Sequence, residues 1–225
     1  SLRRQRQMCI RDRYYAENSC RGRDRYVRQS GSRAAAMNQP LASTRKAAFL
    51  DRDGVINIDH GYVSEPSKFE FIDGVFDACR HLQQQGYLLI VVTNQSGIGR
   101  GYYSEQQFHV LTDWMKAQFE AHGVTLTDVF FCPHHPVNAI PPYQIDCDCR
   151  KPAPGMLLQA IEKYQIDPNQ SLMLGDKKAD MQAAKAAGVG RKVLVLSGQT
   201  LTTEDKASAD EVWPSIKAAQ ELVTN

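Results

Sequence analysis

Two aspartates, Asp51 and Asp53, lie one residue apart where a short apolar segment runs into a turn at Gly54. A carboxylate fixed at the end of a strand can attack phosphorus as a nucleophile. A second carboxylate two residues on can donate a proton to the leaving oxygen. An isolated Asp-x-Asp-Gly is more often a solvated turn. Suitable polar residues at the other strand ends would favour the catalytic interpretation.

Further polar groups follow the other apolar segments of the chain. Thr93 ends the second segment, Lys151 ends a long loop after the third, and Asp176 follows the fourth. Phosphoryl transfer needs such groups, because its catalysis depends on positioning and on neutralising oxygen charge. Thr93 and Lys151 can stabilise the phosphoryl group. Asp51, Asp176 and the backbone carbonyl of Asp53 can supply the oxygen ligands of Mg²⁺.

Short apolar segments alternate with helical patterns from residue 47 onward, which predicts an α/β fold with a Rossmann-like parallel sheet and helices on both faces. The predicted strands span residues 47–50, 87–93, 129–132, 171–175 and 192–196. The predicted helices span residues 73–85, 104–122, 154–164, 179–187 and 214–223. Ligands of such folds lie beyond the carboxyl ends of the strands, so we expect the polar groups to meet at one edge.

Cysteine and histidine pairs occupy a proline-rich loop at residues 132–150. Thiolate and imidazole ligands favour a structural zinc site. The candidate ligands are Cys132, His134, Cys147 and Cys149. His135 is the alternative to His134, and a disulfide or unrelated free cysteines are the competing interpretations, the disulfide being disfavoured in a cytoplasmic enzyme. A loop held by zinc would keep Arg150 and Lys151 in position before the phosphate binds.

The charge of the chain is unevenly distributed. Residues 1–46 carry 12 Lys and Arg against 3 Asp and Glu, whereas the remaining residues carry 15 against 22. We expect residues 1–46 to be a disordered basic tail, with translation starting near Met37; a nucleic-acid or targeting arm is the alternative. The acidic remainder, residues 47–225, is expected to be a single domain that does not bind nucleic acid.

The chain has no apolar run near the roughly 18 to 20 residues that cross a membrane. We therefore expect a cytoplasmic protein without a membrane partner. No long apolar surface stripe is evident in the sequence, so a monomer is expected. The connections are too short to hold a large cap domain, which leaves the predicted site open.

Four segments resemble the motifs of the haloacid dehalogenase superfamily of phosphatases, and the resemblance covers about residues 47–196. These segments are Asp51-Arg52-Asp53-Gly54, Thr93-Asn94, Lys151 and Gly175-Asp176. The resemblance implies a Mg²⁺-dependent phosphatase with an aspartyl-phosphate intermediate, in which Asp51 is the nucleophile and Asp53 the proton donor and then acceptor. Asp180 could orient a metal-bound water or lie on a helix surface.

The end of the zinc loop, Cys149-Arg150-Lys151-Pro152, is similar to a subgroup that hydrolyses heptose bisphosphates or histidinol phosphate. Residues 59–63 and 99–102 resemble the heptose enzymes. The resemblance therefore implies removal of the 7-phosphate of D-glycero-D-manno-heptose 1,7-bisphosphate, in the biosynthesis of lipopolysaccharide core or related heptose products. Histidinol phosphate is the alternative substrate. A non-catalytic phosphate-binding module is the remote alternative, because binding alone would not need Asp53.

A bisphosphorylated sugar needs cations beyond those at the reacting phosphate. The residues expected to contact the substrate are Asp59, His60, Gly61, Tyr62, Asn94, Gln95, Ser96, Arg150 and Lys177. Arg100 could be another outer clamp or a surface arginine. The sequence does not decide between the α and β anomers of the sugar.

Overall fold

The computed structural model describes residues 45–222 of the chain. The predicted basic tail and the start near Met37 therefore lie almost wholly outside the described residues. Lys46, which we assigned to the tail, instead begins the first strand.

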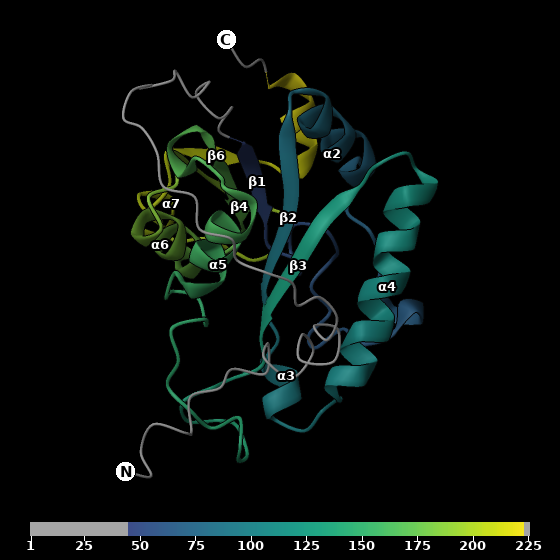
Figure 1. Cartoon of the computed structure of the whole chain (residues 1–225), viewed down its shortest axis with the longest axis vertical. Helices are drawn as coiled ribbons and strands as arrows, with labels where there is room; N and C mark the ends of the chain where they lie inside the picture. Colours follow the sequence, from purple (N-terminus) through teal and green to yellow (C-terminus); the bar gives the residue numbers. More distant parts are fainter. Residues whose placement is uncertain (1–44, 223–225) are drawn as a thin grey trace, which may run out of the picture. The chain divides into compact units, whose positions relative to one another are not determined.

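The described residues form a six-stranded parallel sheet with the order β3-β2-β1-β4-β5-β6 (Figure 1). Its strands are β1 (Lys46–Leu50), β2 (Tyr87–Asn94), β3 (Leu126–Cys132), β4 (Leu172–Gly175), β5 (Arg191–Val195) and β6 (Glu211–Trp213). The chain builds the sheet outward from β1 to β3 and then returns to place β4 on the other side of β1. In doubly wound sheets this reversal between neighbouring strands creates the ligand-binding crevice.

Helices cover both faces of the sheet, as the sequence predicts. One face packs against α2 (Val75–Gln84) and α4 (Glu105–Ala121), and the other against α5 (Gly155–Tyr164) and α6 (Lys178–Ala186). The two layers are visible on either side of the strands (Figure 1). Because successive strand residues point to opposite faces, Leu50 joins the first core and Phe49 the second. This alternation fixes which face each helix covers.

The start of α4 shows how local sequence sets an element boundary. The Ser104 hydroxyl accepts a hydrogen bond from the Gln107 N–H, and the Gln107 side chain accepts one from the Ser104 N–H. This reciprocal pair satisfies two N–H groups that the first helical turn leaves free. It fixes the start of α4 at Glu105.

Several short elements differ from the sequence prediction. The predicted final helix is a 3-10 helix, η3 (Ile216–Glu221), and the three-residue strand β6 precedes it. The described chain also contains α3 (Ser96–Gly99), α7 (Thr203–Lys206), η1 (Pro66–Lys68) and η2 (Pro168–Gln170), none of which was predicted. Segments of three to six residues carry too few turns for hydrophobic periodicity to reveal them.

Two long connections follow the carboxyl ends of β1 and β3. The connection between β1 and α2 contains only η1, and the connection between β3 and α5 contains neither helix nor strand. Neither forms a large cap domain, as expected. Within residues 45–222, no helix is both long enough and apolar enough to span a bilayer.

Candidate active site

Asp51 and Lys151 form the centre of the site at the carboxyl edge of the sheet. Asp51 directly follows β1 and is almost fully buried, and its N–H donates to the Leu174 carbonyl of the neighbouring β4 (3.0 Å). The Lys151 Nζ lies 3.0 Å from the Asp51 Oδ1 and 2.6 Å from the Asp180 Oδ1. It also donates to the Val92 carbonyl (2.7 Å). One buried cation thus orients two carboxylates.

The charge state of Lys151 follows from these partners. Burial opposes the charged form, but the carboxylates of Asp180 and Asp51 outweigh it and raise the pKa of Lys151 above its ordinary value. The two carboxylates therefore favour the charged form of Lys151 at this edge of the sheet. Such a cation can neutralise charge on the oxygens of a transferring phosphoryl group.

Asn94 positions Lys151 from the end of β2. Its Nδ2 donates to the Lys151 carbonyl and its Oδ1 accepts from the Lys151 N–H, both at 3.0 Å. We expected Asn94 to contact the substrate. In the structure both polar atoms of this side chain bond to the backbone of Lys151, and the substrate contact stays a prediction.

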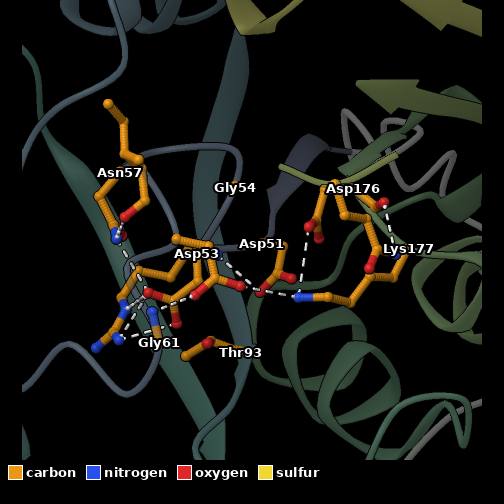
Figure 2. Close-up of polar contacts among 12 residues, drawn as sticks. Asp51, Asp53, Gly54, Asn57, Gly61, Thr93, Asp176 and Lys177 are labelled. Atoms are coloured by element: carbon orange, nitrogen blue, oxygen red, sulfur yellow. Dashed lines mark hydrogen bonds and ion pairs between the residues drawn. The ribbon is translucent and has the colours of Figure 1, made fainter. Parts of the chain in front are cut away.

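Asp53 is held by a set of donors beside Asp51 (Figure 2). Arg52 donates from its Nε (3.2 Å) and its Nη2 (2.9 Å) to the Asp53 carboxylate, and Asn57 adds a third donor at 3.0 Å. Burial opposes ionisation, but the charge and hydrogen bonds of Arg52, with those of Asn57 and Gln95, lower the pKa of Asp53 below its ordinary value. The side chain is therefore fixed in one orientation.

Gln95 links Asp53 to Thr93 in a buried network. Its Nε2 lies 2.7 Å from the Thr93 Oγ1 and 3.2 Å from the Asp53 Oδ2, and its Oε1 accepts from the Tyr103 hydroxyl (2.6 Å). Gln95 is buried, and its side chain holds Asp53 and Thr93 in place through these hydrogen bonds. Ser96, the next residue, begins the short helix α3.

Asp176 is a buried carboxylate that accepts no hydrogen bond from the described residues. It follows β4, and both of its carboxylate oxygens are buried without a hydrogen-bond partner. The Lys177 Nζ approaches one oxygen at 3.4 Å without forming a hydrogen bond. A Cβ on Gly54 would lie 2.6 Å from the same carboxylate, so only glycine leaves room there.

The carboxylates of Asp51, Asp176 and Asp180 gather within 4.8 Å of one another. Burial raises the pKa of Asp51 and of Asp176 above the ordinary value, and the charge of Asp51 raises that of Asp176 further. Carboxylate oxygens suit a hard divalent cation such as Mg²⁺, and both oxygens of Asp176 are free of hydrogen bonds within the described residues. The donor set therefore fits the cation that the sequence predicts. Asp176 and Asp51 lie near each other in Figure 2.

Asp180 does not lie on a helix surface, which was one of its two expected positions. It is buried, and its Oδ2 accepts from the Lys177 N–H (3.0 Å) at the start of α6. Its other oxygen pairs with Lys151. The spacing of four residues from Asp176 was the only sequence signal for this side chain, and it could not reveal the contact with Lys151.

The predicted substrate loop at residues 59–62 lies at the rim. The Lys177 Nζ lies 3.4 Å from the Asp59 Oδ2, which ties this loop to the start of α6. The Asp59 Oδ1 accepts from the Gly61 N–H (3.0 Å), and His60 pairs with Glu70 in an exposed contact. The loop thus places Asp59 toward the site, whereas His60 is engaged with an exposed carboxylate.

The zinc loop brings its four predicted ligands together. The ligand atoms of Cys132, His134, Cys147 and Cys149 lie within 4.8 Å of one another. The Sγ–Sγ separations are 3.2 to 3.6 Å, and the His134 Nδ1 lies 3.4 Å from the Cys149 Sγ. A tetrahedral zinc with Zn–S bonds of 2.3 Å needs separations of roughly 3.7 Å. The cluster fits such a site after a small expansion.

His135 and Arg150, which are adjacent in the chain to ligands of this cluster, bond to backbone groups of the loop. The Nδ1 of His135, the alternative ligand, accepts from the N–H groups of Val137 and Asn138 instead of joining the cluster. Arg150 donates from its Nη1 to the His134 carbonyl (3.2 Å). Arg150 is therefore tied to the zinc loop, and its delivery to a phosphate stays a prediction.

Comparison with known proteins identifies the family. A family model described as HAD-hydrolase-like matches residues 148–219. Over 170 residues, the chain is 54% identical to the D-glycero-beta-D-manno-heptose-1,7-bisphosphate 7-phosphatase of Yersinia pestis, covering 76% of this chain and 90% of that protein. The chain belongs to the haloacid dehalogenase superfamily. It is a phosphoric monoester hydrolase of this superfamily, as the resemblance implied.

Two further matches agree with this assignment. The enzyme of the same name from Escherichia coli K12 is 52% identical over 176 residues, covering 78% of this chain and 92% of that protein. The crystal structure of the D,D-heptose 1,7-bisphosphate phosphatase from B. bronchiseptica, in complex with magnesium and phosphate, superposes with a TM-score of 0.67 at 30% identity. That match covers 78% of this chain and 96% of the other, so the predicted Rossmann-like fold is confirmed.

Proposed function

We propose that this phosphatase removes the 7-phosphate of D-glycero-β-D-manno-heptose 1,7-bisphosphate with the help of Mg²⁺. The relatives at 52–54% identity carry the name of this activity, including the β anomer that the sequence alone left open. The observation that carries the proposal is the contact of Lys151 with both Asp51 and Asp180, beside the Asp176 carboxylate, which accepts no hydrogen bond. This arrangement can hold and neutralise a phosphoryl group beside a fixed carboxylate.

In the proposed mechanism, an oxygen of Asp51 attacks the phosphorus of the 7-phosphate, and the bond to the sugar oxygen breaks. Lys151 keeps the attacking carboxylate aimed and neutralises phosphoryl oxygens, and the Thr93 hydroxyl donates to one of them. Water then hydrolyses the aspartyl phosphate and restores the Asp51 carboxylate. Asp51, Asp176 and the backbone carbonyl of Asp53 would hold Mg²⁺, which offsets the repulsion between the carboxylate and the phosphate.

Asp53 carries the proton in both steps. It donates to the sugar oxygen as that oxygen leaves, and it then accepts a proton from the attacking water. Donation requires a protonated Asp53, and the negative charge of an arriving phosphate raises the affinity of this carboxyl for a proton. Arg52, Asn57 and Gln95 hold Asp53 at the fixed position that both steps need.

Replacing Asp53 with asparagine tests the proton donor. We expect kcat for the heptose bisphosphate to fall by about 10² to 10³-fold with KM little changed. With para-nitrophenyl phosphate the leaving group is stable as an anion, so we expect a burst of nitrophenolate before the slow second step. Stopped-flow absorbance measures this burst. Equal impairment of the burst and of sugar phosphate release would contradict a role in protonating the leaving group.

Zinc at the cysteine cluster is part of the proposal, with Cys132, His134, Cys147 and Cys149 as ligands. Four soft ligands of this kind make a closed structural site. Because Arg150 and Lys151 follow Cys149 directly in the chain, a rigid cluster would hold both cations in place without help from the substrate.

Replacing Cys149 with serine is therefore expected to lower the zinc content, the Tm and kcat together. Elemental analysis, thermal denaturation and phosphate release measure the three effects. Cys79→Ser is the matched control, because Cys79 is a buried cysteine of α2 outside the cluster. It should lower the Tm but retain zinc. An unchanged zinc content in Cys149→Ser, or zinc loss with full kcat, would refute this part of the proposal.

The substrate is tested by measuring kcat/KM with Mg²⁺ on the two heptose 1,7-bisphosphate anomers and on histidinol phosphate. We expect the β anomer to be the best substrate. A higher kcat/KM for histidinol phosphate would replace the proposed function with the alternative. Absence of turnover with all three, in protein that binds Mg²⁺, would contradict a phosphatase for either substrate.

The remaining features of the proposal concern the setting of the reaction. We propose that the enzyme acts in the cytoplasm, because reduced thiols and a small phosphorylated metabolite suit a reducing compartment. We also propose that it is a monomer and that it binds neither nucleic acid nor membranes. Light scattering of the purified chain tests the oligomeric state.

A further inference from the structure

Two exposed tyrosines and an arginine form a cluster at the rim of the site. The side chains of Tyr62 and Tyr102 are 47% and 60% exposed, and their rings meet edge to face with centroids 4.7 Å apart. The Arg100 guanidinium lies over the Tyr62 ring, with its Cζ 5.9 Å from the ring centroid. We call these three residues the tyrosine–arginine cluster.

Both segments that carry the cluster are tied to Asp53. The Val63 carbonyl, next to Tyr62, accepts a hydrogen bond from Arg52 (2.9 Å), whose side chain also pairs with Asp53. Tyr103, next to Tyr102, donates to Gln95, which in turn donates to Asp53. The cluster therefore belongs to the same side of the site as the proposed proton donor. Asp53 and Asp176 lie on opposite sides of Asp51 in Figure 2.

The backbone around the cluster is held in unusual or closely packed conformations. Tyr62 has a φ of 52°, in the left-handed region that side chains other than glycine and asparagine seldom adopt. Strain of this kind is concentrated at binding sites. The carbonyl of Gly99, just before Arg100, accepts from the Ile140 N–H of the zinc loop (2.8 Å). A Cβ on Gly99 would lie 2.5 Å from the Pro133 carbonyl oxygen, so this segment packs tightly on the zinc loop.

Arg100 has no anionic partner among residues 45–222. Within residues 45–222, its side chain forms no salt bridge, and its Nε is buried without a hydrogen bond. Lys177 pairs with Asp59 and Asp176, Lys151 pairs with Asp51 and Asp180, and Arg150 donates to a backbone carbonyl. Among the described residues of this edge, Arg100 and Arg150 thus lack a carboxylate partner, and Arg100 is the one that lies over the Tyr62 ring.

We propose that the tyrosine–arginine cluster binds the leaving group, with Arg100 taking its second phosphate and the two tyrosines contacting the sugar. A proton donor must lie within hydrogen-bond reach of the leaving oxygen, so the sugar leaves on the side of Asp53. A planar guanidinium can hold a phosphate through two parallel hydrogen bonds. Tyrosine rings present an apolar face and a polar hydroxyl, which suits a sugar. This inference rests on the proposed function.

The test compares two substrates that differ only in the second phosphate, the heptose 1,7-bisphosphate and the heptose 7-phosphate. We expect Arg100→Gln to lower kcat/KM for the bisphosphate by roughly 10- to 100-fold and to leave kcat/KM for the 7-phosphate within about twofold. Arg100→Lys should recover part of the loss, because it keeps the charge but not the planar fork. Tyr102→Ala should instead raise KM for both substrates, by roughly 3- to 10-fold.

Arg80→Gln is the matched control, since Arg80 is an exposed arginine of α2 that contacts Asp77 and the His122 carbonyl. It should leave kcat/KM for both substrates unchanged. Equal loss on the two substrates in Arg100→Gln, or no loss on either, would overturn the role of Arg100 while leaving the proposed function intact. Failure of the unaltered protein to hydrolyse the bisphosphate would overturn the proposed function, and this inference with it.

Discussion

Replacing Asp51 with asparagine is expected to abolish turnover, lowering kcat by on the order of 10⁴-fold or more. Asparagine has nearly the shape of aspartate, but its amide oxygen is too weak a nucleophile to displace the sugar from phosphorus. The side chain can still accept a hydrogen bond from Lys151, which lies 3.0 Å from the Asp51 Oδ1. The fold should therefore survive while the covalent step is lost.

Phosphate release under saturating substrate measures this effect, and circular dichroism and zinc content confirm that the variant is folded. The neutral side chain also removes a negative charge that raises the pKa of Asp176. The variant loses an ion pair with Lys151 but also loses the repulsion between Asp51 and Asp176. Because these two effects oppose each other, the Tm of Asp51→Asn without Mg²⁺ should be close to that of the unaltered protein. A folded variant that retained more than about one tenth of kcat would be incompatible with nucleophilic attack by this residue.

Replacing Lys151 with methionine is expected to damage both turnover and stability. Methionine fills a similar volume but leaves the carboxylates of Asp51 and Asp180 buried without their shared cation. Removing one partner of a buried ion pair costs about 3 to 5 kcal/mol. Losing a charge at the phosphoryl oxygens lowers kcat by about 10² to 10³-fold. Urea denaturation and phosphate release measure the two effects separately.

Two further variants separate the causes of these losses. The double variant Lys151→Met with Asp180→Asn removes one unpaired charge, so it should recover part of the stability without recovering kcat. Lys163→Met is the matched control, because Lys163 pairs with Asp128 in a solvent-exposed contact. Such a pair contributes about 0 to 1 kcal/mol. Similar stability losses in Lys151→Met and Lys163→Met would show that the buried pair does not have the role described.

The strand ends were predictable because two simple regularities combine. Apolar segments of four to eight residues between helical patterns indicate a parallel sheet, and the carboxyl ends of parallel strands share one edge. The structure accordingly places Asp51, Thr93, Lys151 and Asp176 at that edge. The four zinc-loop side chains were predictable for a similar reason, since close pairs of soft ligands in a loop have few other uses.

The supporting contacts could not be read from the sequence, because they depend on how side chains turn once the strands have packed. The Asn94 side chain bonds to the backbone of Lys151, and Gln95 lies in a buried network. Arg52 is a buried arginine that joins Asp53 to the carbonyl of Val63. These interactions join residues up to 57 positions apart, a separation at which periodicity carries no information.

The most direct test is to look for a phosphoryl group on Asp51 during turnover. Excess protein with Mg²⁺ is mixed with the heptose 1,7-bisphosphate, quenched in acid within one turnover, and its peptides are analysed by mass spectrometry. We predict that the peptide containing Asp51 carries the mass of one phosphoryl group, and that Asp51→Asn shows none. Complete phosphate release without this adduct at any quench time, or an adduct on a different residue, would contradict nucleophilic catalysis by Asp51.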